Sequence, residues 1–249
     1  MVPVQVEHKM EGESTMTKIL SHTGNEVYVG HFQGNAMKKS MDIIEEYSAN
    51  RIEISPRISV ITTFTNKNKA ITALQLELSN MPYINACPEG VEEWTNIDKI
   101  KYYVGALEQT TSEYCLLVDG YDVLFFKNLD ETFIQKFEHL NTKILFNATK
   151  NNHPNMEIDI VENRDSLGEF KYLNAGVVFG KTQDLLKFYK EVLITTQRKD
   201  IMNPWNSEQL FVRIVANGNP DVSFDHQCAL FQTFSKTEKT VCGNTAIII

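Results

Sequence analysis

The chain has 249 residues, of which 42% are hydrophobic and 22% are charged. This composition provides enough apolar material for a folded core and excludes an intrinsically disordered chain. Lys and Arg number 24 and Asp and Glu number 32, so the net charge is −8. A chain this acidic lacks the positive surface of a general nucleic-acid binder. Nucleic acid is therefore excluded as a default partner, whereas a nucleotide neutralised by a cation or by nearby lysines is not.

The sequence shows no pattern typical of a membrane helix, a secretory signal or a cysteine-based zinc site. No run of residues approaches the ~20 apolar positions that a membrane helix needs. The start of the chain, Met1 to His8, lacks the basic-then-apolar layout of a secretory signal. The four cysteines are scattered, without a CxxC pair or a histidine at zinc spacing. We expect a soluble protein without a membrane span, cytoplasmic by default and lumenal if it belongs to a larger precursor.

The first 55 residues differ from the rest of the chain. They are more polar, and their periodicity predicts one helix from Asn35 to Tyr47 with methionine and isoleucine on one face. Strong strand and helix signals begin only after Pro56. We therefore expect an N-terminal extension of uncertain structure over residues 1–55 and one main domain over residues 56–249.

Strand and helix patterns alternate through the main domain. The expected strands are Ile58–Phe64, Tyr83–Ala86, Tyr114–Val118, Lys143–Ala148, Ala175–Phe179 and Val222–Phe224. The expected helices cover residues 65–78, 96–107, 130–140, 182–194 and 206–216. Such alternation predicts an α/β fold with a mostly parallel central sheet and helices on both faces. Ligands in these folds bind at the carboxyl ends of the strands.

An acidic turn follows the most apolar of the expected strands. Asp119 and Asp122 are three residues apart, directly after Tyr114–Val118. Two carboxylates at such short range repel one another, and a cation between them removes the repulsion. Oxygen ligands of this kind suit Mg²⁺ or Mn²⁺. The alternative is an ordinary Asp-Gly turn with solvated acids, but apolar segments on both sides hold this turn between buried strands and favour the metal site.

Four motifs occur in an order that resembles a known family. They are Asp119–Val123 (DGYDV), Tyr172–Gly180 (YLNAGVVFG), Glu208–Phe211 (EQLF) and Asp225–Gln232 (DHQCALFQ). Together they resemble the glycosyltransferase domain of procollagen lysyl hydroxylases and the related collagen β-galactosyltransferases, over about Ile58 to Ile249. The resemblance implies a GT-A (Rossmann-like) fold, a UDP-sugar donor and Mn²⁺ or Mg²⁺. It also implies transfer of galactose or glucose to a hydroxyl acceptor on protein or glycan, such as hydroxylysine or galactosyl-hydroxylysine of a collagen-like protein.

The resemblance assigns the metal and nucleotide residues. Asp119 and Asp122 correspond to the two metal-binding aspartates of the family. Trp94 matches the aromatic residue that stacks near the uridine. A threonine at the end of the first strand contacts the nucleotide, and the candidates here are Thr62, Thr63 and Thr65.

Three further residues are assigned to the donor. Lys99 matches a family lysine at the start of its helix, where a cation neutralises phosphate; the alternative is a solvated lysine on the helix face. Asn174 and Gly176 match the L-N-[SA]-G element that lines the sugar pocket. Asn174 offers a donor and an acceptor to sugar hydroxyls, and Gly176 permits close backbone approach. A turn entering the next strand is the compatible alternative.

The acceptor-side residue is less defined. Glu208 lies where relatives carry an acidic residue just before Gln-Leu-Phe, and it is the first candidate for the group that orients or deprotonates the acceptor hydroxyl. Ser207 departs from the Asp-Asp pair of the family, which leaves the identity of a catalytic base open. Glu208 is alternatively an acid favoured by the helix dipole. Asp159 and Asp165 are weaker candidates in the polar loop before Tyr172.

A third metal ligand is missing from its expected place. In the family, a histidine follows the last apolar strand and precedes a Gly-Asn-Gly stretch. Here the sequence stops at Thr245–Ile249. Either the ligand lies beyond this point, or metal binding rests on the aspartates and the phosphates. His226 is a possible substitute, but we expect it to be a structural histidine of its turn.

Two other function classes remain open from the sequence. One is a non-catalytic GT-A module that holds a nucleotide-sugar or a partner without turnover, which the missing ligand favours. The other is a metal-dependent phosphoester hydrolase built on the same acidic turn. A hydrolase of that kind normally needs more clustered carboxylates and histidines than the sequence contains.

Overall fold

The computed structural model describes most of the main domain and parts of the N-terminal segment. The described residues are 4–7, 18–19, 24–32, 52–155, 168–234, 239–242 and 245–248. The helix predicted from Asn35 to Tyr47 and the candidate acids Asp159 and Asp165 lie outside these residues.

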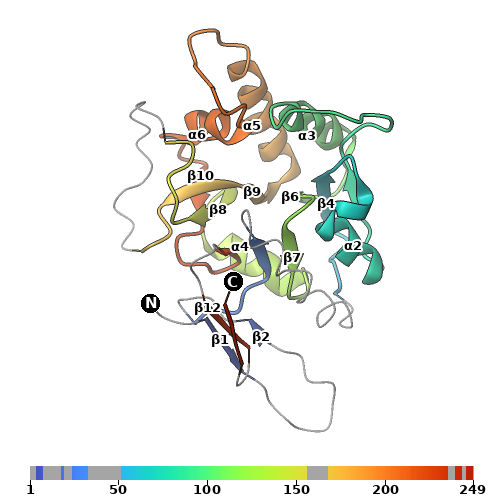
Figure 1. Ribbon diagram of the computed structural model, residues 1–249, viewed down its shortest axis with the longest axis vertical. Helices are drawn as coiled ribbons and strands as arrows, with labels where there is room; N and C mark the ends of the chain where they lie inside the picture. Colours follow the sequence, from blue (N-terminus) through green and yellow to red (C-terminus); the bar gives the residue numbers. More distant parts are fainter. Residues whose placement is uncertain are drawn as a thin grey trace.

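A six-stranded sheet forms the centre of the domain, in the order β10-β8-β9-β6-β4-β5 (Figure 1). Its strands are β4 (Ile58–Thr63), β5 (Ile84–Asn85), β6 (Tyr114–Asp119), β8 (Ile144–Thr149), β9 (Tyr172–Lys181) and β10 (Val222–Phe224). Strand β9 runs antiparallel to both β6 and β8, and the other three pairs are parallel. The predicted mostly parallel α/β sheet is confirmed.

Helices cover both faces of this sheet, as predicted. They are α2 (Ile71–Leu78), α3 (Asp98–Gln109), α4 (Glu131–His139), α5 (Thr182–Thr195) and α6 (Glu208–Ala216). In Figure 1, α3, α5 and α6 gather on one side of the sheet and α4 on the other. Phe133 and Phe137 of α4 pack on Phe179 of β9, whereas Tyr103 of α3 meets Tyr189 of α5 in the opposite core.

Local sequence explains where several of these helices begin. Asp130 caps α4, because its carboxylate accepts the Thr132 and Phe133 N–H groups. The helix predicted from residue 65 is divided in two: Asn66 caps a short 3₁₀ turn, η2 (Lys67–Lys69), and α2 begins after Ala70. None of the described helices is both long and apolar enough to traverse a bilayer.

A second sheet, in the order β11-β3-β7, lies beside the central one. Its strands are β3 (Val29–Phe32), β7 (Val123–Phe125) and β11 (Phe231–Phe234). Strand β3 pairs in parallel with β11 and antiparallel with β7. Because β7 directly follows the acidic turn, a strand from the first 55 residues is paired with the strand that leaves the predicted metal site.

The remaining strands form a small sheet in the order β13-β12-β1-β2. They are β1 (Val4–Glu7), β2 (Lys18–Ile19), β12 (Lys239–Cys242) and β13 (Thr245–Ile248). Strand β1 pairs in parallel with β12, so the two ends of the sequence meet in one sheet. Figure 1 shows this sheet next to both termini.

Candidate active site

The acidic turn is fixed at the carboxyl end of the central sheet. Asp119 is the last residue of β6, and Gly120 packs against β4 so closely that a Cβ atom would lie 2.5 Å from the Thr63 carbonyl oxygen. Glycine is therefore required at this position. The Tyr121 hydroxyl accepts a hydrogen bond of 3.0 Å from the backbone N–H of Thr65. The close packing of Gly120 and the hydrogen bond of Tyr121 both hold the turn against the end of β4.

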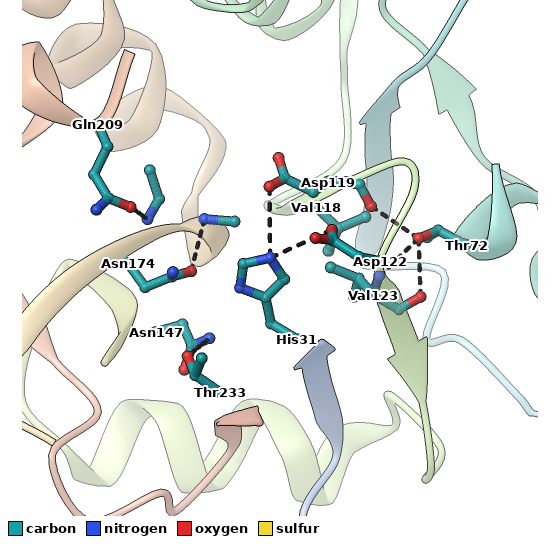
Figure 2. Close-up of polar contacts among 12 residues, drawn as sticks. His31, Thr72, Val118, Asp119, Asp122, Val123, Asn147, Asn174, Gln209 and Thr233 are labelled. Atoms are coloured by element: carbon teal, nitrogen blue, oxygen red, sulfur yellow. Dashed lines mark hydrogen bonds and ion pairs between the residues drawn. The ribbon is translucent and has the colours of Figure 1, made fainter. Parts of the chain in front are cut away.

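Helix α2 supplies side chains that hold the backbone after the turn. The Thr72 hydroxyl lies 2.8 Å from the carbonyl oxygens of both Asp119 and Val123, and it accepts the Val123 N–H at 3.1 Å (Figure 2). The Gln75 carboxamide bonds both the N–H and the carbonyl of Phe125. These contacts satisfy buried backbone groups of β7 and thereby fix the two aspartates relative to each other.

A buried histidine completes the group. His31, on β3, is 4% exposed, and its Nε2 lies 3.3 Å from Asp122 Oδ1 and 3.7 Å from Asp119 Oδ2. One ligand atom from each of the three residues falls within 4.8 Å of the others. Figure 2 shows the imidazole and the two carboxylates pointing toward one another. The second ring nitrogen, Nδ1, has no hydrogen-bond partner among the described residues.

These residues fit a divalent metal ion. One imidazole nitrogen and two carboxylate oxygens are a donor set that Mn²⁺ accepts, and substrate oxygens normally complete its coordination. Backbone contacts of β3, β6 and β7 bring the three side chains together. The predicted pairing of Asp119 with Asp122 is therefore seen in the structure, and His31 supplies a third donor.

Sequence reasoning missed His31 because it looked for the third ligand at the other end of the chain. The signal was present. An apolar run, Val27–Gly30, leads into His31, and Gly34 and Asn35 follow shortly after it. This is the strand, histidine and Gly-Asn pattern that was expected after the last strand. Pairing of β3 with β7 brings it to the acidic turn from the N-terminal side.

A buried lysine adjoins this group. Lys99, in the first turn of α3, is 5% exposed, and its Nζ lies 2.5 Å from Asp119 Oδ1 and 2.5 Å from Glu208 Oε1. Asp119 thus contacts Lys99 through Oδ1 and faces His31 with Oδ2. The alternative interpretation, a solvated lysine on the helix face, is wrong, because this side chain is buried and contacts two carboxylates.

The charges of the group reinforce one another. Burial opposes the charged form of Lys99, but Asp119 and Glu208 outweigh it and raise its pKa well above the ordinary value. Burial likewise opposes ionisation of Asp119, yet Lys99 and His31 lower the pKa of its carboxyl. For His31, the neighbouring Asp122 and Asp119 outweigh burial and raise the pKa of the imidazole. The contacts among Lys99, Asp119 and His31 therefore favour the charged forms of these three side chains.

The Leu-Asn-Ala-Gly motif forms an irregularity in β9 beside His31, Asp119 and Asp122, which we call the metal-binding group because their donor atoms suit a divalent ion. The register of β9 with β8 jumps from Val178 to Asn174. The Asn174 carboxamide oxygen accepts the Gly176 N–H at 3.0 Å, and the Gln209 side-chain oxygen accepts the Ala175 N–H at 2.9 Å (Figure 2). A side chain at Gly176 would collide with His31, because its Cβ would lie 2.5 Å from His31 Cε1. The motif makes room for the imidazole.

The other predicted nucleotide residues lie around the end of β4. Thr62 and Thr63 are buried within the strand, whereas Thr65 lies beyond it and lines a hollow of about 410 Å³. Residues 65–68 and 90–92 form its walls. Trp94, two residues further on, is half-buried with its ring 5.9 Å from that of Tyr102. Their roles toward a nucleotide remain predictions.

His226 has the structural role that we expected for it. Its Nδ1 lies 2.6 Å from the Phe170 carbonyl oxygen. It is not part of the His31, Asp119 and Asp122 group. The neighbouring Asp225 accepts the N–H groups of Ala229, Leu230 and Phe231, which fixes the turn into β11.

Comparison with known proteins identifies the domain. No curated protein matches this chain. A family model described as the PLOD GT domain matches residues 93–245, which is more than half of the chain. The matched stretch contains Lys99, the acidic turn, the Leu-Asn-Ala-Gly motif and Glu208, whereas His31 lies before it. The chain therefore belongs to the PLOD GT domain family, and the family resemblance of its motifs is confirmed.

Proposed function

We propose that this domain transfers a hexose, galactose or glucose, from a UDP-sugar to a hydroxyl acceptor in the presence of Mn²⁺ or Mg²⁺. The observation that carries the proposal is the convergence of His31, Asp119 and Asp122 on one point, with the buried Lys99 beside them. Membership of a glycosyltransferase domain family supports the reaction class. Donor, acceptor and metal identity are part of the proposal.

Charge balance supports a requirement for a divalent ion. Asp119, Asp122 and Glu208 carry three negative charges against the single positive charge of Lys99, which leaves two in excess once His31 gives up its proton to act as a metal ligand. A diphosphate approaching such a site meets repulsion rather than attraction. One divalent cation cancels the excess, so a nucleotide diphosphate and the metal are expected to bind together.

The residues at the site have separate roles in binding the sugar donor and stabilising its diphosphate. His31, Asp119 and Asp122 would hold the metal, which when bound supplies Lewis-acid stabilisation of the departing diphosphate. Lys99 adds a fixed positive charge on the protein side. Gly176 keeps the backbone of β9 clear of the imidazole. These groups are positioned before the substrate arrives, which is the condition for effective electrostatic stabilisation.

The nucleoside is proposed to occupy the hollow beyond β4. Thr65 lines this hollow, and its backbone N–H donates to the Tyr121 hydroxyl of the acidic turn, a contact that supports this proposal. Trp94 follows closely in sequence and offers a ring on which uracil can stack. The volume of about 410 Å³ is in the range of small-molecule sites.

The acceptor is proposed by kinship alone. Hydroxylysine or galactosyl-hydroxylysine of a collagen-like protein is the acceptor that the family suggests. Asn174 remains a predicted contact of the donor sugar, although its carboxamide oxygen also holds the Gly176 N–H. The structure supports the transferase over a passive module in one respect: His31 offers the third donor whose apparent absence favoured the module.

A donor screen tests this function. The domain is incubated with Mn²⁺ and single UDP-sugars, with and without a galactosyl-hydroxylysine or hydroxylysine peptide, and released UDP is measured. We expect release from one hexose donor that depends on Mn²⁺ and rises with the correct acceptor. Chelation of the metal should abolish it. Binding of UDP with Mn²⁺ but no release from any donor with any acceptor would instead establish a binding module.

A further inference from the structure

Lys99 shares one of its carboxylate partners with the metal-binding group. Its ammonium lies 2.5 Å from Asp119, which is partly exposed, and 2.5 Å from Glu208. The Lys99 and Glu208 side chains are 6% and 12% exposed. Charge-assisted hydrogen bonds in such settings are about twice as strong as neutral ones. The Glu208 carboxylate is therefore paired with the Lys99 ammonium.

We infer that Glu208 is a positioning residue that holds Lys99 beside the metal-binding group. The inference rests on the proposed function, because it assigns Lys99 to the diphosphate of the donor. A lysine with Asp119 as its sole anionic partner would close onto that carboxylate and compete with the metal for it. A second carboxylate divides the ammonium hydrogen bonds between two acceptors and fixes Nζ at one point.

The first turn of α6 is anchored in a way that suits this role. Gln209, next to Glu208, accepts the Ala175 N–H of β9 at 2.9 Å, and its amide nitrogen donates to the His153 carbonyl. Glu208 is thus carried on a helix start that is fixed to the central sheet. A base for an incoming hydroxyl needs a free oxygen aimed at the acceptor, and one of the two oxygens of Glu208, Oε1, is already engaged by Lys99.

Binding of UDP separates a positioning role from a catalytic one, because binding needs no acceptor and no base. The experiment measures the Kd of UDP in saturating Mn²⁺ by calorimetry. The proteins are wild type, Glu208→Ala, Glu208→Gln, Lys99→Met and the Lys99→Met/Glu208→Ala double variant. Thermal melting checks that each variant is folded, and Glu208→Gln keeps the shape of the side chain if Glu208→Ala is unstable.

The positioning role predicts a specific pattern. Loss of the anchor in Glu208→Ala should weaken UDP binding about tenfold, as should Lys99→Met, which matches the loss of one charge-assisted hydrogen bond. Glu208→Gln retains an oxygen that accepts from Lys99 and should stay within about threefold of wild type. The double variant should bind UDP within about twofold of Lys99→Met, because Glu208 acts through the lysine.

Other outcomes overturn the inference. Unchanged UDP affinity in Glu208→Ala, combined with a loss of kcat of about 10²-fold or more in both Glu208 variants, would identify Glu208 as the base. Tighter UDP binding would show that Glu208 acts through its charge alone. Additive losses in the double variant, or a glutamine variant as weak as alanine, would show that it does not act through Lys99.

The same titrations distinguish failure of the inference from failure of the proposed function. Wild-type protein that binds Mn²⁺ but no UDP would reject the function, and the inference with it. Wild-type protein that binds both, with Glu208 variants that depart from the predicted pattern, would reject the inference and leave the transferase standing. The predicted pattern of UDP binding, together with a raised KM and a near-normal kcat in Glu208→Ala, supports both.

Discussion

Replacing Asp119 by asparagine is expected to abolish Mn²⁺-dependent binding of UDP. The aspartate faces His31 with one oxygen and Lys99 with the other, so the change removes the charge from a metal donor and from one partner of Lys99 at once. Loss of groups that merely support metal ligands already costs about 10–100-fold in affinity. We expect a loss of Mn²⁺ affinity of at least about 100-fold, measured by calorimetry or by titration with the paramagnetic ion.

The control for this variant is Asp200→Asn. Asp200 is an exposed aspartate that pairs with Arg198 two residues away, and it lies outside the metal-binding group. The same chemical change there should leave Mn²⁺ and UDP affinity at wild-type values. The Asp119→Asn protein should remain folded, because Lys99 keeps Glu208 as a partner. Unchanged Mn²⁺ affinity in a folded Asp119→Asn protein would contradict the assignment of this aspartate.

A single methyl group at position 176 is expected to disrupt the metal-binding group. In Gly176→Ala the added carbon would lie 2.5 Å from His31 Cε1, a distance at which the ring must move. Displacing the imidazole should lower Mn²⁺ affinity by about 10–100-fold. Overpacking in this buried setting should also cost about 1–3 kcal/mol of unfolding free energy, measured by urea denaturation.

Two variants control this prediction. Gly105 lies on α3, and a Cβ atom added there would have nothing within 4 Å, so Gly105→Ala should leave the metal affinity unchanged. Alanine also favours the helix, by about 0.8–1.0 kcal/mol. The double variant Gly176→Ala/His31→Ala removes the collision and should recover stability without recovering metal binding. A Gly176→Ala protein with wild-type Mn²⁺ affinity would show that His31 is not a required ligand.

The central sheet was predictable because its strands are marked by their own residues. Tyr114–Val118 is continuously apolar, and β6 is buried along nearly all of its length. Helical periodicity likewise placed α3 to α6 close to their observed bounds. The direction of β9 was not foreseen as antiparallel. Periodicity reports burial and cannot report strand direction, which depends on how the chain returns to the sheet.

The second sheet was harder to predict because its partners are distant in sequence. β3 and β11 are about two hundred positions apart, and each strand has only four residues. In such short segments, neither the length nor the alternation of hydrophobic and polar residues distinguishes a strand from a buried loop. The acidic turn, by contrast, was predictable from Asp119 and Asp122 together with the apolar segments on both sides of them. What the sequence could not show is that β3 delivers His31 to that turn.

The residues assigned to the sugar donor were also predictable to different degrees. Lys99 was assigned to the site through the family resemblance, and the structure shows its contact with Asp119 of the acidic turn. Its second partner, Glu208, comes from α6, and this contact depends on the anchoring of that helix to β9 through Gln209. Side-chain pairing across separate elements is set by tertiary packing, and no local pattern reports it.

The proposed function requires that His31, Asp119 and Asp122 together hold a divalent ion. The most direct measurement is pulsed electron paramagnetic resonance of the domain loaded with one equivalent of Mn²⁺. We predict electron spin-echo modulation from a directly bound histidine nitrogen in the wild-type protein, and its loss in His31→Gln while the aspartates remain. A bound Mn²⁺ signal without nitrogen modulation, or nitrogen modulation that persists in His31→Gln, would contradict it.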